Sequence, residues 1–175
     1  MVPQADEGLS RPALEALYRR LEKPLYNVLY RWTWDAEEAH ELVQETFLRL
    51  WQMRDRVRME TVDALAFRIG SNLAANRRRS RRLRRWVTLD AVRDRTARIP
   101  GADEAVELRQ VRHAVRRAID SLPERLRHVV LLCEYSGMSY REIARALRIP
   151  EGTVGSRRNT ALRRLRGMLE PLLEV

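Results

Sequence analysis

Apolar residues recur at steps of three and four along most of this chain, and that spacing marks one face of an α-helix. The first run follows Ser10 and includes Leu14, Leu17 and Leu21. Pro24 is expected to kink or divide this helix, because proline lacks an amide hydrogen. Only seven Gly and seven Pro occur in 175 residues, which is few for a turn-rich β architecture. We therefore predict an all-α fold.

Start and stop signals divide the rest of the chain. Asp35 can cap the free amides of a second helix that ends at about Met53. Periodicity fades after about residue 86, and Pro100-Gly101 is a strong helix breaker. Further helices are expected over 64–83, 105–119, 121–135, 139–147 and 153–173. These signals predict two small helical domains, over 12–86 and 108–173, joined by a flexible linker over 87–107.

The positive charge is concentrated in two segments. The chain carries 34 basic and 24 acidic residues, a net charge of +10, and every basic residue except Lys23 is Arg. The net charge is −2 over 1–76, +8 over 77–98, zero over 99–140 and +4 over 141–175. Arg binds phosphate bidentately, so this distribution indicates a protein that contacts a polyanion at two places. A GC-rich genome or a solvated Arg-rich face would explain the bias without nucleic acid.

The second expected helix has a distinctive outer face. At 100° per residue, Leu48 lies opposite the core stripe, within a polar rim that consists of Glu41, Gln44, Glu45 and Gln52. An apolar centre in such a rim is typical of a docking patch for another protein. A single exposed leucine is also common on protein surfaces and needs no partner.

The third expected helix ends in a cluster of seven Arg within residues 77–85. Guanidinium groups this close together repel one another in the absence of a polyanion. Phosphate is the natural counter-charge, so this cluster is the first candidate contact with nucleic acid.

Residues 139–166 contain the most specific pattern. Ser139 and Glu142 form a capping box that opens a short helix, and a tight turn over 148–152 leads into an Arg-rich second helix. These are the parts of a helix-turn-helix, whose second helix enters the major groove of DNA. A helical hairpin that serves packing alone is the alternative, and the net +4 favours DNA. The candidate contacts to bases or phosphates are Ser156, Arg157 and Asn159.

Several other classes of protein are disfavoured. The three His residues are scattered, and neither a metal-ligand spacing nor a phosphate-binding loop occurs. The lone Cys133 has apolar neighbours and is expected to be a small buried side chain. No run of about 18 apolar residues could span a bilayer. We therefore expect a cytoplasmic protein that is not an enzyme, with no metal, no cofactor and no membrane insertion.

Six motifs occur in one order along the chain: Asp35-Ala-Glu-Glu, Leu42-Val-Gln-Glu-Thr-Phe-Leu-Arg-Leu-Trp, Phe67-Arg-Ile-Gly-Ser-Asn-Leu-Ala, Leu122-Pro-Glu, Ser139-Tyr-Arg-Glu-Ile-Ala and Ile149-Pro-Glu-Gly-Thr-Val. In this order and spacing they resemble the extracytoplasmic-function (ECF) sigma factors of bacterial RNA polymerase, over about residues 12–170. The resemblance implies a non-catalytic subunit that directs promoter-specific transcription initiation, in a stress or extracytoplasmic signal response. A free-standing helix-turn-helix regulator is the alternative.

The resemblance also implies roles for particular residues. The first domain would bind the clamp helices of the polymerase β′ subunit through Glu38, Glu41, Gln44, Glu45 and Leu48. Its third helix would recognise the minus-ten promoter element through Asn72, Arg77, Arg78 and Arg79. The second domain would contact the β flap and bind the minus-thirty-five element through Thr153, Ser156, Arg157, Asn159 and Arg163. An anti-sigma factor is the further partner that the resemblance implies.

The helix-turn-helix departs from the family pattern at four positions. Arg148 stands in the turn where Gly is usual, and Arg would cost about 1 kcal/mol relative to Gly if the backbone there is left-handed. Gly155 and Thr160 stand where basic residues are frequent, and Arg158 stands at a position that is usually aliphatic. These departures weaken any prediction of the minus-thirty-five sequence.

Overall fold

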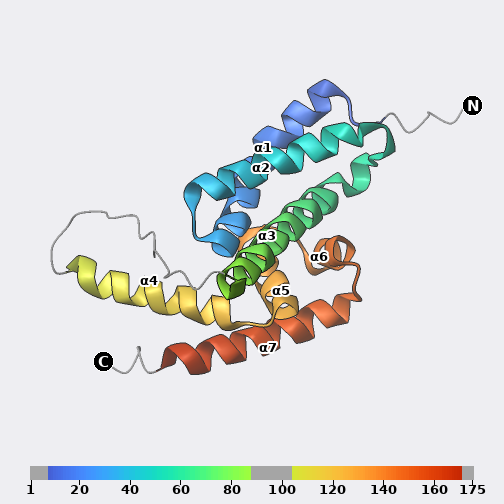
Figure 1. Ribbon diagram of the computed structural model, residues 1–175. Coiled ribbons are helices and arrows are strands. Elements are labelled where there is room, and N and C mark those ends of the chain that lie inside the picture. The colour runs from blue at the N-terminus through green and yellow to red at the C-terminus, as the bar shows by residue number, and fades with distance from the viewer. Residues whose placement is uncertain (1–7, 88–103, 171–175) are drawn as a thin grey trace, which may run out of the picture.

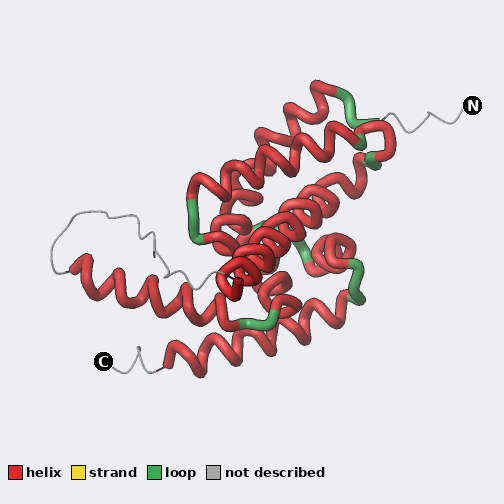
Figure 2. Tube along the Cα trace, in the orientation of Figure 1, coloured by secondary structure: helices red, strands yellow, loops and turns green. Residues whose placement is uncertain are grey.

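The computed structural model describes residues 8–87 and 104–170, and every regular element in these two segments is a helix (Figure 1 and Figure 2). The predicted all-α class is confirmed. The linker predicted over 87–107 falls mostly outside the described residues. The first segment holds α1 (Arg11–Thr33), α2 (Ala36–Gln52), the 3-10 turns η1 (Arg54–Arg56) and η2 (Met59–Thr61), and α3 (Val62–Val87). The second holds α4 (Glu104–Ser121), α5 (Glu124–Tyr135), α6 (Tyr140–Leu147) and α7 (Glu151–Leu169).

Helices α1, α2 and α3 pack together as the first domain. Asp35 caps α2 as predicted, since its carboxylate accepts a hydrogen bond from the Glu38 amide at 3.0 Å. Pro24 lies inside α1 without dividing it, contrary to one of the two expectations for this residue. The apolar stripes at helical spacing face inward and bury Leu17, Leu21, Leu25, Val28, Leu29, Leu42, Val43, Phe47 and Leu50.

Gly70 sets how closely α3 approaches the other two helices of the first domain. A Cβ atom at this position would lie 3.0 Å from Leu25 Cδ1 and 3.1 Å from Thr46 Oγ1. Those separations are tighter than ordinary van der Waals contact, so a larger residue would push the helices apart.

Helices α4 to α7 form the second domain, in which α6 and α7 make the predicted helix-turn-helix. The capping box is present: Ser139 Oγ accepts from the Glu142 amide at 3.3 Å, and the Glu142 carboxylate accepts from the Ser139 amide at 2.7 Å. The Ser139 hydroxyl also donates to the Glu142 carboxylate, at 2.6 Å, and this hydrogen bond together with that of the Ser139 amide lowers the pKa of Glu142. Arg148 ends α6 with φ 54°, so the turn does require the left-handed backbone that favours Gly.

The two domains pack against each other. Helix α1 contacts α5, and α3 contacts α6. Trp32 of α1 is only 2% exposed and meets the His128 ring of α5 edge-on, with the ring centroids 4.6 Å apart. The Arg31 guanidinium lies 3.9 Å from the centre of the Tyr135 ring. The buried residues of both domains therefore form one continuous apolar cluster.

Candidate polymerase and nucleic-acid interfaces

The outer face of α2 presents one apolar side chain in a polar rim. Leu48 is 55% exposed, Glu41 and Gln44 are exposed beside it, and Glu45 is partly buried. Glu45 accepts a hydrogen bond from Arg49, one turn along the helix, at 2.7 Å. These four residues, Glu41, Gln44, Glu45 and Leu48, are called the α2 outer face below. Their arrangement, an apolar centre with a charged rim, is that of a small protein-docking surface.

Glu38, also among the predicted polymerase contacts, lies apart from this face. Its side chain is buried, and its carboxylate lies 2.7 Å from Nη2 of Arg81 and 3.9 Å from Nη1 of Arg77. Burial raises the pKa of Glu38 and outweighs the lowering effect of Arg81 and Arg77. The residue links α2 to α3, because it lies on the side of α2 that α3 covers.

Arg77, at the start of the basic cluster on α3, pairs with the α2 outer face. Its guanidinium lies 2.7 Å from the Glu41 carboxylate and 3.5 Å from that of Glu45. Arg77, a predicted minus-ten residue, therefore adjoins two predicted polymerase contacts, and their charges partly neutralise each other.

Arg78 and Arg79 pair with carboxylates of the second domain. Arg78 contacts the carboxylate of Asp120, near the end of α4, and donates to the Asp120 carbonyl at 2.9 Å. Arg79 lies 3.4 Å from the carboxylate of Glu124, the first residue of α5. Nε1 of Trp34 also donates to the Asp120 carboxylate, at 3.2 Å. Two of the predicted minus-ten arginines, Arg78 and Arg79, thus bridge the two domains in this arrangement.

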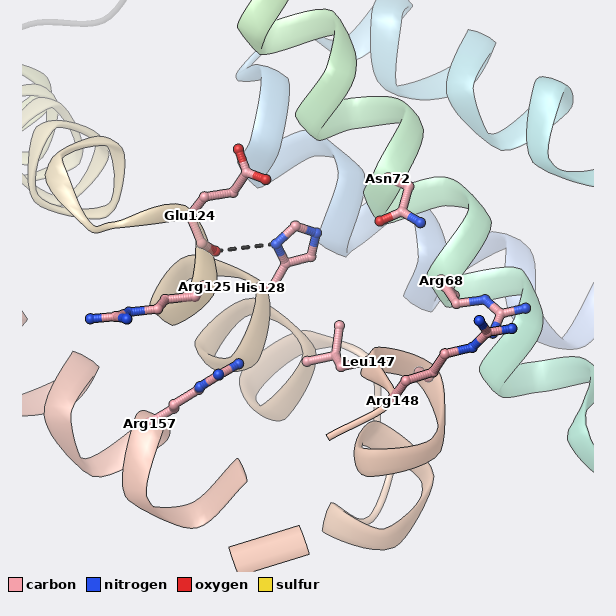
Figure 3. Close-up of a pocket in the computed structure, with 9 residues that line it drawn as sticks. Arg68, Asn72, Glu124, Arg125, His128, Leu147, Arg148 and Arg157 are labelled. Carbon is pink, nitrogen blue, oxygen red and sulfur yellow. Dashed lines mark hydrogen bonds between the residues drawn. The ribbon is translucent and has the colours of Figure 1, made fainter. Parts of the chain in front are cut away.

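Asn72 and Arg157, predicted to contact separate promoter elements, line the same cavity. Asn72 is exposed on α3, and Arg157 is partly buried on α7 (Figure 3). The contact between α3 and the second domain brings these two residues together, although they are 85 positions apart in the chain.

The other predicted minus-thirty-five residues remain accessible on α7. Arg158 pairs with Glu134 of α5 at 2.8 Å, which explains how a charged residue replaces the usual aliphatic one. Ser156 Oγ donates to the Thr153 carbonyl at 3.1 Å, so its lone pairs are available to a ligand. Thr153 is partly buried, and the exposed members of the set are Ser156, Asn159 and Arg163.

Arg127 of α5 is a residue that the sequence patterns do not single out. It is buried and donates from Nε to the Ile119 carbonyl at 2.9 Å, from Nη2 to the Leu122 carbonyl at 2.8 Å, and to the Asp120 carbonyl. Burial, with a contribution from the charge of Arg78, lowers its pKa to about 10. The guanidinium thus donates to carbonyls at and just beyond the end of α4, where helical partners run out. The sequence signal for this residue was its spacing of three and four from Val130 and Leu131, which places it on an apolar face of the helix.

Other sites were sought in the described part of the chain. No group of three or more His, Cys, Asp or Glu side chains is placed there to hold a metal ion. None of its helices combines the length and apolar character needed to cross a bilayer. Cys133 is half-buried, and burial raises its pKa to about 11, so its thiol is protonated at neutral pH.

Family models match both domains, and related proteins match most of the chain. The sigma-70 region 2 model covers residues 17–84, and the sigma-70 region 4 model covers residues 112–165. The ECF RNA polymerase sigma factor SigL of Mycobacterium tuberculosis is 34% identical over 161 residues, which are 91% of this chain and 90% of SigL. The ECF sigma factor SigE of Mycolicibacterium smegmatis is 32% identical over 166 residues. That match covers 90% of this chain but only 62% of SigE.

Solved structures show the same fold. The sigma factor RpoE of Bartonella quintana, in complex with the anti-sigma factor NepR, matches with a TM-score of 0.68 at 22% identity, over 89% of this chain and 96% of that one. CnrH, in complex with the cytosolic domain of CnrY, matches with a TM-score of 0.66 at 22% identity, over 93% of this chain and 90% of that one.

A region 2 bundle followed by a region 4 helix-turn-helix defines a protein of the sigma-70 type. Together with the relatives, it shows that the chain belongs to the ECF RNA polymerase sigma factors. The chain is thus a transcription initiation factor that serves RNA polymerase at promoters.

Proposed function

We propose that the α2 outer face binds core RNA polymerase, with the β′ clamp helices as its partner and the β flap as the partner of the second domain. The observation that carries this proposal is Leu48, which is 55% exposed at the centre of charged and amide side chains. A regulator that binds DNA alone would not need this apolar docking surface. The chain acts by binding and performs no catalytic step, in the cytoplasm beside the core polymerase.

We propose that α3 contacts the minus-ten element through Asn72, Arg77, Arg78 and Arg79. All three arginines are paired with carboxylates. DNA phosphates therefore have to replace Glu41, Asp120 and Glu124 as their partners. For Arg78 and Arg79 this replacement requires the domains to separate. The proposed minus-thirty-five contacts are Thr153, Ser156, Arg157, Asn159 and Arg163.

An anti-sigma factor is the further partner that we propose. Support comes from the fold shared with the RpoE sigma factor, whose structure was solved with the anti-sigma factor NepR. Release from such a partner would allow a stress or extracytoplasmic signal to control transcription. Recovery of one protein with the tagged chain from its native host, and inhibition of transcription by that protein, would test this partner.

Reconstitution separates the sigma function from the alternative of a free-standing regulator. The purified chain is added to core RNA polymerase together with fragments of the host genome, and run-off transcripts are sequenced. We expect transcripts with discrete start sites that require the chain. Tight binding to duplex DNA by the chain alone, with no dependent transcript from any fragment, would overturn the proposal.

A matched pair of substitutions tests the α2 outer face. Leu48→Arg, alone or with Glu45→Arg, should abolish co-purification with core polymerase while the Tm is retained. Leu108→Arg on α4 is the control for Leu48→Arg, because Leu108 is 52% exposed and both substitutions add one positive charge. Loss of binding in both variants, or in neither, would contradict the assignment of the interface.

A further inference from the structure

A cavity between the two domains carries positive charge that the residues described in the structure do not neutralise. Its volume is about 570 Å³, and it lies between α3 on one side and α5, α6 and α7 on the other. Glu124 is the one acid among the described residues that line it. Four of the nine lining residues are arginines: Arg68, Arg125, Arg148 and Arg157.

Glu124 does not neutralise these arginines, because it is already paired with Arg79 at 3.4 Å. Figure 3 shows its carboxylate pointing away from the four guanidinium groups. The acid that lines the cavity therefore belongs to the contact between α3 and α5, and no other acid of the described residues lines the cavity to balance the arginines.

Arg68 and Arg148 meet at one end of the cavity. Their guanidinium groups lie together in Figure 3, Arg68 from α3 and Arg148 from the turn after α6. Burial and the nearby charge of Arg148 both lower the pKa of Arg68. Two like charges brought together from different domains repel each other, and an anion bound between them would turn that repulsion into attraction.

A second cavity of similar size provides the comparison. It has a volume of about 540 Å³ and is also lined by arginines, including Arg78 and Arg81. In that cavity Arg78 pairs with Asp120, and Arg81 lies 2.7 Å from Glu38. Five arginines and two acids line the second cavity, so it too has a surplus of positive charge, but Arg77, Arg78 and Arg81 are each paired with a carboxylate.

We propose that the first cavity binds a nucleoside polyphosphate, which holds the two domains in the closed arrangement. A volume of about 570 Å³ lies within the range of about 300–1,000 Å³ that is usual for small-molecule sites. Arg68 and Arg148 would bind the phosphates bidentately, and Arg157 would bind them from α7. Figure 3 places His128 and Leu147 between these arginines, where a ring and an apolar side chain suit the nucleoside.

The cavity favours a small anion over a nucleic-acid strand because its volume is limited, at about 570 Å³, and both domains line it. Asn72 and Arg157 line it, and both are proposed promoter contacts. A bound polyphosphate would therefore compete with promoter DNA. This consequence rests on the proposed function, whereas the binding of the anion does not.

Calorimetric titration of the full chain tests the site in the absence of DNA and polymerase. ATP, GTP and inorganic tripolyphosphate are titrated separately, and we expect saturable binding of one nucleotide per chain. Arg68→Gln with Arg148→Gln should weaken binding at least tenfold, and so should Arg125→Gln with Arg157→Gln at the other end. Arg19→Gln with Lys23→Gln on α1 removes the same charge from an exposed surface and should leave binding unchanged.

Each alternative outcome overturns a stated part of the proposal. No saturable binding of any probe, or equal weakening by the α1 control pair, would show that the cavity is not a site. Tripolyphosphate binding as tightly as ATP and GTP would remove the nucleoside from the proposal. Failure of the chain to support transcription, with nucleotide binding intact, would contradict the proposed function alone.

Discussion

Arg127 is a charged side chain surrounded almost entirely by protein. Its three carbonyl partners end α4, and its guanidinium also lies 5.3 Å from the centre of the Trp32 ring. Its lowered pKa reflects the loss of water that these contacts require. The residue therefore orders the junction between α4 and α5 on which the domain contact is built.

Substitution of Arg127 should destabilise the protein strongly. Arg127→Met removes one donor from each of three carbonyls and should lower the free energy of unfolding by about 3 kcal/mol. Arg127→Lys should recover little of this loss, because an ammonium lacks the planar fork. Urea denaturation measures the free energy of unfolding of both variants. Arg125→Met, at an exposed position on α5, is the control, and its free energy of unfolding should lie within about 0.5 kcal/mol of that of the parent. An Arg127→Met variant as stable as this control would contradict the capping role.

His128 is the titratable residue at the centre of the domain boundary. It packs against Trp32, and its Nδ1 is 3.1 Å from the carbonyl oxygen of Glu124. Burial lowers its pKa, and the charges of Arg127 and Arg79 add to this effect, while the carbonyl and carboxylate of Glu124 oppose it. The neutral ring is therefore the form that fits the closed arrangement.

The stability of the protein should fall on acidification through the histidine range. The unfolded chain binds a proton at His128 near pH 6.5, and the folded chain binds it only at lower pH. The stabilisation is thus present above about pH 6.5 and decreases as the pH falls below that value. Thermal unfolding between about pH 7.5 and 5.5 should show this decrease. His128→Phe should reduce it and His113→Phe, at an exposed position on α4, should not; equal pH dependence in both variants would refute the assignment.

At the scale of helices, Gly70 determines the packing of α1, α2 and α3. Gly70→Ala places a methyl group 3.0 Å from Leu25 and 3.1 Å from Thr46, so it should lower the free energy of unfolding by about 1–3 kcal/mol. Gly167→Ala in α7 is the matched control, since no atom lies within 4 Å of its added methyl group. That substitution should raise stability by about 0.5–1 kcal/mol through helix propensity alone. A Gly70→Ala variant that is also stabilised would show that the bundle can adjust.

Local signals predicted the helices well, because each signal acts within a few residues. Asp35 and the Ser139 capping box begin helices as expected, and Arg148 adopts the anticipated left-handed backbone. Helix α7 begins at Glu151, two residues earlier than predicted, because the residue after a proline readily starts a helix. The burial of Glu38 was not predictable, because it depends on how α3 lies against α2, which no period within α2 encodes.

Local sequence patterns could not predict the contacts between distant segments of the chain. Arg78 and Asp120 are 42 positions apart, and the near-neutral segment that contains Asp120 had no feature to mark it as a partner. The docking leucine of α2 was predictable from helical geometry, whereas the shared cavity of Asn72 and Arg157 depends on the packing of the domains. The sequence therefore indicated the surfaces but not which of them face each other.

For the whole molecule, the closed arrangement opposes the proposed DNA binding. Asn72, Arg78, Arg79 and Arg157 all lie at the domain boundary. Partly exposed ion pairs contribute about 0–1 kcal/mol each, so the boundary depends mainly on the burial of Trp32 and its neighbours. The domains are thus expected to separate far more readily than either core unfolds.

Asp120→Ala should shift the molecule toward the open form, because the variant loses the carboxylate that binds both Arg78 and Trp34. A loss of about 1 kcal/mol changes the ratio of closed to open molecules about fivefold. Small-angle scattering should show a larger radius of gyration, and promoter DNA held by core polymerase should bind more tightly. Glu170→Ala removes the same charge from an exposed position after α7, so it controls for non-specific attraction to DNA. Both variants could instead keep the radius of gyration of the parent and bind DNA equally tightly. Any gain in DNA binding would then come from the removed negative charge alone, and the closed arrangement would not limit promoter recognition.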